Sequence, residues 1–319
     1  MLRRIAPALL LALAVTACSS SGGSSTSSSA SREPAAASGT VTTSTAPSAS
    51  PASPAPLAQL PRGGRTIFPG HVVVAYYGTA GSGALGVLGE TGPEVAARRT
   101  LQAAIPFQPA SGRPVLPAFE LITTVAAGKP GPDGLYSTKL PVSEVLRYVE
   151  VARKNKMLVI LDFQPGRAEF LDQVKEYEQA LLQPEVGVAL DPEWKLTASQ
   201  RPLRQIGVSG ATPINAVSSY LANLTLKNRL PEKIFMVHQF KTYQLPDRDR
   251  IVDRPGLATV LHVDGFGTQY AKKHTYALLA SRTPQFVNAF KLFYDEDTDL
   301  MTPAQAMALR PMPELITYQ

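Results

Sequence analysis

The chain has 319 residues, of which 44% are hydrophobic, and a formal net charge of +6. A chain of this length can bury a substantial core without disulfides, and its single cysteine leaves no partner for one. The Lys and Arg residues form no long cluster, so the composition does not favour a nucleic-acid-binding protein.

The N-terminal segment has the features of an export signal. Two arginines precede an apolar run from Ile5 to Val15, which is too short to span a bilayer as a stable helix. The run ends in Val15-Thr-Ala-Cys18, which resembles the lipobox of bacterial lipoproteins. This resemblance implies that residues 1–17 are a signal peptide, that Cys18 is lipidated, and that the protein is anchored to the cell membrane on its extracytoplasmic face. The alternative is an ordinary secretory signal with a chance cysteine.

Residues 18–61 are expected to be a disordered tether. They are almost wholly Ser, Thr, Ala, Pro and Gly, a composition that cannot bury enough apolar surface to fold. The remaining segment, 62–319, is close to the ~250 residues of one (β/α)₈ TIM barrel.

Strand and helix patterns alternate along 62–319, and this order predicts a parallel sheet. Helices are expected at 93–104, 141–155, 168–182, 212–228 and 268–280, with weaker ones at 247–253 and from Thr302. The expected strands are 71–77, 118–125, 157–164, one within 185–194, 233–240, 258–264, 285–293 and 315–319. Eight strands with helices between them predict a (β/α)₈ barrel, and an open doubly wound sheet is the alternative.

The fourth strand is the most informative one. Side chains alternate between the faces of a strand, so Gly187, Ala189, Asp191 and Glu193 share one face. Small residues followed by two acids are typical of an inward face that ends at the carboxyl end of a barrel, where the active sites of this fold lie.

Polar residues gather at the carboxyl ends of other strands as well. Converging carboxyl groups suit glycoside hydrolysis, in which one acid protonates the leaving oxygen and a second group stabilises or attacks the anomeric carbon. We therefore predict Glu193 as the general acid, with Asp191 and Asp162 as its partners. The side chains expected to bind substrate, in part by stacking aromatic rings on sugars, are Tyr76, Gln164, Trp194, His238, His262, Asp264, Tyr294 and Asp295.

Asp191-Pro192-Glu193 is similar to the Asp-x-Glu that closes the chitinase-type signature. The resemblance implies that Glu193 is the acid and that Asp191 assists the acetamido group of the substrate. The signature has further aspartates two and five positions before Asp191, where this chain has Ala189 and Val186. The domain as a whole resembles an uncharacterised group of actinobacterial secreted barrels related to glycoside hydrolases.

Neither a nucleotide nor another cofactor is expected. The glycines at 81, 83 and 86 match G-x-G-x-x-G, but they do not follow the strand directly and no acid ends the second strand. No metal is expected either, because the acidic run 295–299 lacks the glycine and terminal glutamate of an EF-hand. The expected protein is a surface lipoprotein that hydrolyses or binds an envelope or environmental glycan. The alternative is a non-catalytic glycan-binding or scaffold lipoprotein on the same fold.

Overall fold

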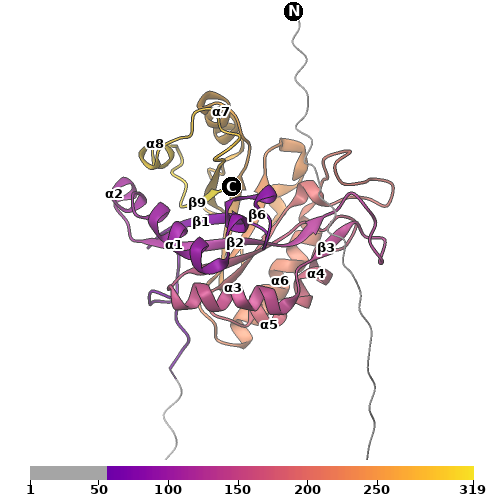
Figure 1. Cartoon of the computed structure of the whole chain (residues 1–319), viewed down its shortest axis with the longest axis horizontal. Coiled ribbons are helices and arrows are strands. Elements are labelled where there is room, and N and C mark those ends of the chain that lie inside the picture. Colours follow the sequence, from indigo (N-terminus) through magenta and orange to yellow (C-terminus); the bar gives the residue numbers. More distant parts are fainter. Residues whose placement is uncertain (1–55) are drawn as a thin grey trace, which may run out of the picture. The chain divides into compact units, whose positions relative to one another are not determined.

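The computed structural model describes residues 56–319. Within this range the chain forms a closed barrel of eight parallel strands with helices between them (Figure 1). The barrel closes because β1 pairs with β2 on one side and with β9 on the other, which excludes the open doubly wound sheet. The expected signal peptide, the lipidation site at Cys18 and most of the expected tether lie outside the described residues.

All eight expected strands are present, within three residues of the expected ends. Their order around the barrel follows the order in the chain, as right-handed βαβ crossovers require. The parallel strands are β1 (Val72–Gly78), β2 (Val115–Ala126), β4 (Leu158–Phe163), β5 (Val186–Leu190), β6 (Lys233–Gln239), β7 (Leu257–Val263), β8 (Val287–Leu292) and β9 (Leu315–Tyr318).

One further strand was not expected from the sequence. β3 (Ser137–Lys139) pairs antiparallel with the end of β2, where Ala126 lies opposite Ser137. It is short and polar, so it carries no hydrophobic alternation that would predict a strand.

The helices cover the outside of the barrel. The helix expected at 168–182 is divided at Tyr177, whose hydroxyl donates a hydrogen bond of 2.7 Å to the carbonyl of Leu140. Five 3₁₀ turns lie in the loops: η1 (Gly83–Leu85), η2 (Val87–Glu90), η3 (Pro192–Trp194), η4 (Thr242–Gln244) and η5 (Arg248–Arg250). The α-helices are α1 (Pro93–Ala104), α2 (Phe107–Ser111), α3 (Val142–Lys154), α4 (Phe170–Glu176), α5 (Glu178–Leu181), α6 (Ala211–Lys227), α7 (Gln269–Leu279) and α8 (Pro303–Met307).

The interior of the barrel is filled from the strands' inward faces. Leu60 and Ile67, from the segment before β1, pack against the same residues. Leu60 lies within the stretch expected to be tether, so the packed structure begins before residue 62. The inner apolar cluster, as we call it, consists on the strands of Val73, Ala75, Leu116, Ala118, Leu158, Ile160, Ala189, Ile234, Met236, Val260, Ala289 and Leu315.

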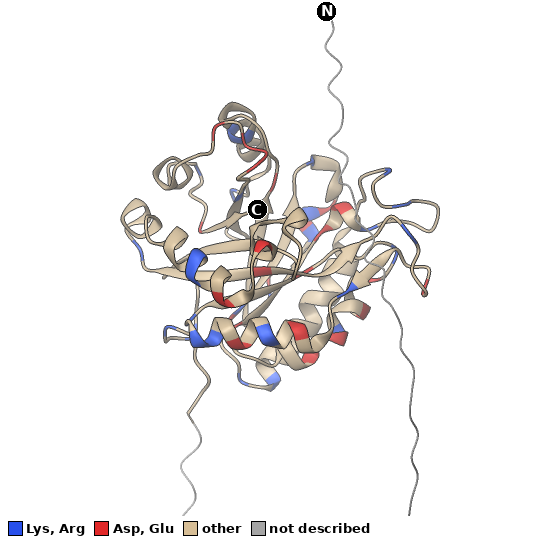
Figure 2. Cartoon of the chain, in the orientation of Figure 1, with Lys and Arg blue, Asp and Glu red and all other residues tan. Residues whose placement is uncertain are grey.

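Charged residues of both signs alternate on the outer helices, most clearly along α3 (Figure 2). Two ion pairs there, Arg147–Glu144 and Lys154–Glu150, each span 2.7 Å and lie at the surface. Such exposed pairs contribute only about 0.3–0.5 kcal/mol each. The helices in the described part of the chain do not have the length and hydrophobicity needed to span a membrane.

We predict that Gly187→Ala lowers the free energy of unfolding by about 1–3 kcal/mol, the usual cost of overpacking a core. A Cβ atom at Gly187 would lie 2.6 Å from the backbone oxygen of Ile234, which belongs to the neighbouring strand. Urea unfolding of both proteins measures the change. Gly70→Ala is the control because the nearest atom to its added Cβ lies 3.7 Å away. Equal midpoints for Gly187→Ala and the wild type would contradict the prediction.

Candidate functional site

A layer of polar side chains lies above the inner apolar cluster, toward the carboxyl ends of the strands. Each of the eight parallel strands contributes one residue to it, within the strand or directly after it, and each residue comes two positions after a member of the inner apolar cluster. Because a step of two residues keeps a side chain on the same face, all eight enter the barrel. None is more than 4% exposed. We call this layer the polar ring: Tyr77, Glu120, Asp162, Asp191, His238, His262, Lys291 and Thr317.

His238 is surrounded by acids in the polar ring. Its Nδ1 lies 2.9 Å from Oδ2 of Asp264 and 3.5 Å from Oδ1 of Asp191. Its Nε2 lies 2.9 Å from Oε1 of Glu120. Burial alone lowers the pKa of His238, but Asp264 and Asp191 outweigh burial and raise this pKa well above its usual value. With no cation other than a proton present, His238 is therefore an imidazolium at neutral pH.

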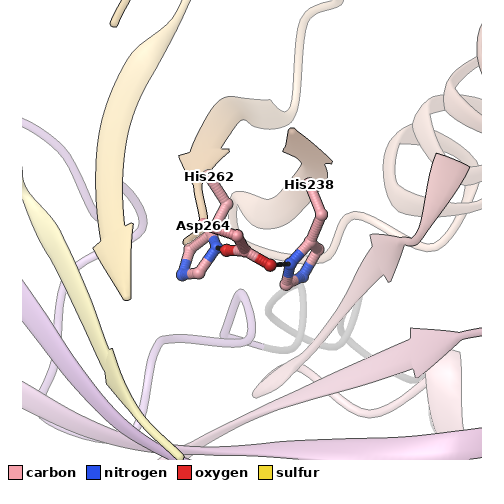
Figure 3. Close-up of side chains that lie close together, drawn as sticks. All are labelled: His238, His262 and Asp264. Carbon is pink, nitrogen blue, oxygen red and sulfur yellow. Dashed lines mark hydrogen bonds and ion pairs between the residues drawn. The ribbon is translucent and has the colours of Figure 1, made fainter. Parts of the chain in front are cut away.

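Asp264 follows β7 and connects two histidines (Figure 3). Its two oxygens bond to Nδ1 of His238 and Nδ1 of His262, and Nζ of Lys291 lies 3.7 Å from Oδ2. Burial raises the pKa of Asp264, but the positive neighbours Lys291 and His238 outweigh it, and the pKa stays well below its usual range. Asp264 is therefore ionised.

His262 is held as the neutral tautomer. Burial and the neighbouring charge of His238 lower its pKa, although Asp264 opposes the shift. Its Nδ1 bonds to Asp264, so Nε2 accepts from the hydroxyl of Thr317 at 2.8 Å.

Lys291 lies against the ring of Tyr77, with Nζ 3.3 Å from the ring centroid. Burial lowers the pKa of Lys291, but Asp264 and Glu120 outweigh burial and raise it. Gln164 holds the tyrosine from the other side, because its Nε2 donates to the Tyr77 hydroxyl at 3.4 Å. The lysine is therefore charged, and its position is fixed by an aromatic face and an acid.

Three acids have raised pKa values. Burial raises the pKa of Asp162 to about 6, although His238 opposes the shift. Burial, reinforced by the charges of Asp162 and Glu193, raises the pKa of Asp191 well above its usual value. Burial and the charge of Asp264 raise the pKa of Glu193 to about 7. At neutral pH these carboxyl groups retain a share of their protons.

The side chain of Glu193 is half-buried, whereas the side chains of the polar ring are fully buried. It lies in η3, which begins directly after Asp191, and its backbone carbonyl accepts a hydrogen bond of 2.6 Å from the amide of Gly207. A Cβ at Gly207 would lie 2.3 Å from the carbonyl oxygen of Lys195, so only glycine allows this close approach. Within residues 56–319, Oε2 of Glu193 is buried and has no hydrogen-bond partner. Trp194, in the same turn, is also half-buried.

The structure brings together most of the residues predicted for the site. Asp162, Asp191, His238 and His262 belong to the polar ring. Glu193 and Asp264 follow the ends of β5 and β7, and the charge of Asp264 acts on Glu193. Gln164 contacts the ring through Tyr77.

Tyr76, Tyr294 and Asp295 lie elsewhere, which corrects their predicted positions. Tyr76 is on the outward face of β1, where its hydroxyl lies 3.3 Å from that of Tyr294. Tyr294 stacks on Tyr318 with ring centroids 4.9 Å apart, also outside the barrel. The alternation of β1 places the adjacent Tyr77 inside instead. Asp295 is exposed, whereas Asp297 is the buried acid of this loop and pairs with Lys272 at 3.0 Å.

The search of strand ends in the sequence offered Tyr77 and Lys291, but it did not find Glu120 or Thr317. Glu120 lies in the middle of β2 rather than at its end, so a search of strand ends does not find it. One signal was available. A single acid within an apolar strand, two positions after Ala118, must share the inward face of that alanine.

No protein-family model matches the chain, and no curated protein matches it. Solved structures similar to it include a hyperthermophilic endo-beta-1,4-glucanase, with TM-score 0.37 and 10% identity over 64% of this chain and 77% of that one. An HpcH/HpaI aldolase from Desulfitobacterium hafniense has TM-score 0.37 and 13% identity over 78% of this chain and 85% of that one. A dihydropteroate synthase from Burkholderia cenocepacia has TM-score 0.33 and 12% identity over 82% of this chain and 90% of that one.

We predict that Glu193→Gln stabilises the protein at about pH 8 relative to about pH 5, by on the order of 1–2 kcal/mol. The folded-state pKa of Glu193, about 7, is above the ordinary value of 4.5. The stability that Glu193 contributes is therefore complete below 4.5 and is lost as the pH rises through 7. The glutamine side chain of the variant is neutral at both pH values, so the variant does not lose stability in this way.

Urea unfolding of the wild type and the variant at both pH values measures this difference. Glu296→Gln, which changes an exposed acid, is the matched control. A Glu193→Gln effect that is the same at both pH values would contradict the assigned pKa.

Proposed function

We propose that this protein is a lipid-anchored, extracytoplasmic glycoside hydrolase with Glu193 as its general acid. One observation carries the proposal: at the carboxyl end of the barrel, the half-buried and partly protonated Glu193 interacts with the ionised Asp264. Two neighbouring carboxyl groups in opposite protonation states are what acid-catalysed glycoside cleavage requires.

The proton states suggest a role for each acid. Glu193 donates its proton to the leaving glycosidic oxygen as the bond to the anomeric carbon breaks. The negative charge of Asp264 stabilises the positive charge that develops on the sugar. A water molecule then attacks the anomeric carbon and returns a proton to the enzyme, which balances the reaction.

Asp191 and Asp162 act as a pair behind Glu193. Asp191 keeps its proton because it is buried among other acids, and its closeness opposes the rise in the pKa of Asp162. Asp162 is fully buried, so we assign it a positioning role rather than contact with substrate. Asp191 is also buried, at 1% exposed, so we assign it a positioning role as well, in place of the substrate contact that the Asp-x-Glu resemblance implies.

Exposed aromatic residues on the loops after β6 and β7, and in the first turn of α7, support a sugar ligand. Tyr243 is 51% exposed, Phe266 59% and Tyr270 82%. Together with the half-buried Trp194 they offer apolar faces on the βα-loops, which form binding sites in this fold. Flat aromatic faces of this kind suit the apolar faces of pyranose rings.

A non-catalytic glycan-binding protein is the second candidate. The pairing of Asp264 with two histidines and Lys291, together with the burial of the polar ring, favours it, because such pairs also stabilise a rigid scaffold. This candidate predicts glycan affinity without any bond cleavage.

The activity test is Glu193→Gln in a screen for released reducing ends over bacterial wall polysaccharides, chitin and storage glucans. We expect the wild type to release sugar from one of them and the variant to lose about 10³-fold in kcat, a typical contribution of general acid catalysis. Wild-type activity should fall as the pH rises past about 7, since Glu193 must hold its proton. Asp295→Asn, at an exposed acid, should keep full activity. If the wild type binds glycans but releases no sugar, the second candidate is correct.

For the lipid anchor we predict that Cys18→Ser moves the full chain, expressed in a bacterial host with lipoprotein export, from the detergent phase to the aqueous phase. Loss of the acyl chains removes about 0.8 kcal/mol of membrane affinity per buried methylene. Detergent phase separation followed by immunoblotting measures the shift. Ser28→Ala is the control in the same segment. If the wild type itself partitions into the aqueous phase, the segment is an ordinary secretory signal.

A further inference from the structure

Three neighbouring side chains of the polar ring carry buried polar atoms that form no regular hydrogen bond. Glu120, Asp162 and His238 are each 0% exposed. Within the described part of the chain, both oxygens of each acid and Nε2 of the histidine are buried and form no hydrogen bond of regular geometry, although Nε2 and Oε1 of Glu120 lie 2.9 Å apart as an ion pair. Each buried unsatisfied group costs about 1–3 kcal/mol. Such a set on three strands of one barrel therefore points to a ligand that satisfies all of them together.

The spacing of these atoms fits a metal ion. One donor atom from each of Glu120, Asp162 and His238 lies within 4.8 Å of the others. Nε2 of His238 lies 2.9 Å from Oε1 of Glu120. Two ligands at right angles around a cation, each about 2.1 Å from it, lie about 3.0 Å apart. The histidine and the glutamate therefore already have the separation of two adjacent ligands.

Asp264 fixes the histidine in the orientation that a metal requires. Nδ1 of His238 lies 2.9 Å from Oδ2 of Asp264 (Figure 3). A neutral His238 therefore holds its proton on Nδ1 and directs the lone pair of Nε2 toward Glu120. A carboxylate that accepts from the outer nitrogen of a ligating histidine is the usual second partner in metal sites. Asp264 is itself held by His262 and Lys291, so it cannot turn away freely.

Protonation of His238 alone would satisfy fewer of these polar atoms than a bound metal ion would. An imidazolium at His238 meets one oxygen of Glu120 but leaves the other oxygen unpaired. A divalent cation meets both acids and the histidine together, and it replaces the proton on Nε2, which leaves to solvent. It also offsets the excess of acids over Lys291 and His238 in this part of the barrel.

We propose that Glu120, Asp162 and Nε2 of His238 bind one divalent first-row transition-metal cation inside the barrel. A set of one imidazole and two carboxylates suits Mn²⁺ or Zn²⁺, since carboxylates favour the former and imidazole the latter. This site goes beyond the proposed hydrolysis, in which Glu193 and Asp264 act on the substrate and Asp162 has only a positioning role. It also differs from the sequence-based expectations that no metal is bound and that His238 binds substrate.

The test uses the full chain, stripped with a chelator and then dialysed against Mn²⁺ or Zn²⁺, with bound metal measured by mass spectrometry. We expect about one cation per chain and a higher thermal midpoint. Glu120→Gln and Asp162→Asn each remove one charged ligand, and we expect each to weaken binding by about 100-fold or more. Asp264→Asn should weaken it by about 10–100-fold through loss of the histidine's orientation.

Two control variants distinguish this site from surface acids and from the proposed hydrolytic site. Asp295→Asn should bind metal as the wild type does, because that acid is exposed and is not one of the proposed ligands. Glu193→Gln should also bind metal normally, so failure of the proposed hydrolysis and failure of the metal site give different results. X-ray absorption of the metal-loaded wild type should show an imidazole ligand. This measurement uses only the wild type, so it does not depend on whether the variants fold.

The proposal is overturned if the wild type binds neither cation under these conditions. It is equally overturned if the bound metal lacks an imidazole ligand, which would indicate adventitious binding to surface acids, or if folded Glu120→Gln binds with wild-type affinity.

Discussion

The negative charge of Asp264 sets the protonation states of the groups around it inside the barrel. It holds Nδ1 of both His238 and His262, and Lys291 lies nearby. The charge of Asp264 raises the pKa of His238 and so helps to keep it protonated. It also counteracts the lowering of the His262 pKa by burial, and it raises the pKa of Glu193. The proposed chemistry and the proposed metal site both require Asp264 to be ionised and fixed.

The polar ring is a costly arrangement for a protein interior. Burying charges destabilises a fold unless each is paired, and removal of one partner of a buried pair typically costs about 3–5 kcal/mol. The inner apolar cluster beneath the ring and the apolar contacts between strands and helices supply the opposing stability. Buried polar groups that reduce stability are characteristic of a functional site. A core selected only for stability would have apolar side chains in this layer as well.

The two proposals occupy different depths of the same barrel. Glu120, Asp162 and His238 lie within their strands, whereas Glu193 and Asp264 follow strand ends, nearer the loops that carry the exposed aromatic residues. His238 connects the two levels, since it contacts Glu120 on one side and Asp264 on the other. A cation at the inner level would therefore act on Glu193 through the His238–Asp264 pair and would not contact it.

The sequence by itself determined the alternating order of strands and helices, and hence a parallel sheet, but it left a closed barrel and an open doubly wound sheet as alternatives. Each strand is a short apolar run, each main helix has its own periodicity, and these local patterns have the alternating order that only a parallel barrel or sheet accommodates. The same alternation determined that Asp191 shares the face of Gly187 and Ala189, but it did not place Glu193, which lies in η3 after the strand has ended.

Only the tertiary structure decided how these residues combine. Closure through the β1–β9 pairing brings Lys291 and Thr317 to Tyr77, and these are contacts between distant parts of the chain that no local pattern specifies. Which of two adjacent tyrosines faces inward depends on the register of β1, because a shift of one residue reverses every face. The partners of Glu120 and His238, and therefore their charges, likewise depend on how the strands meet in space, because Coulomb interactions depend on distance in the folded molecule and not on separation along the chain.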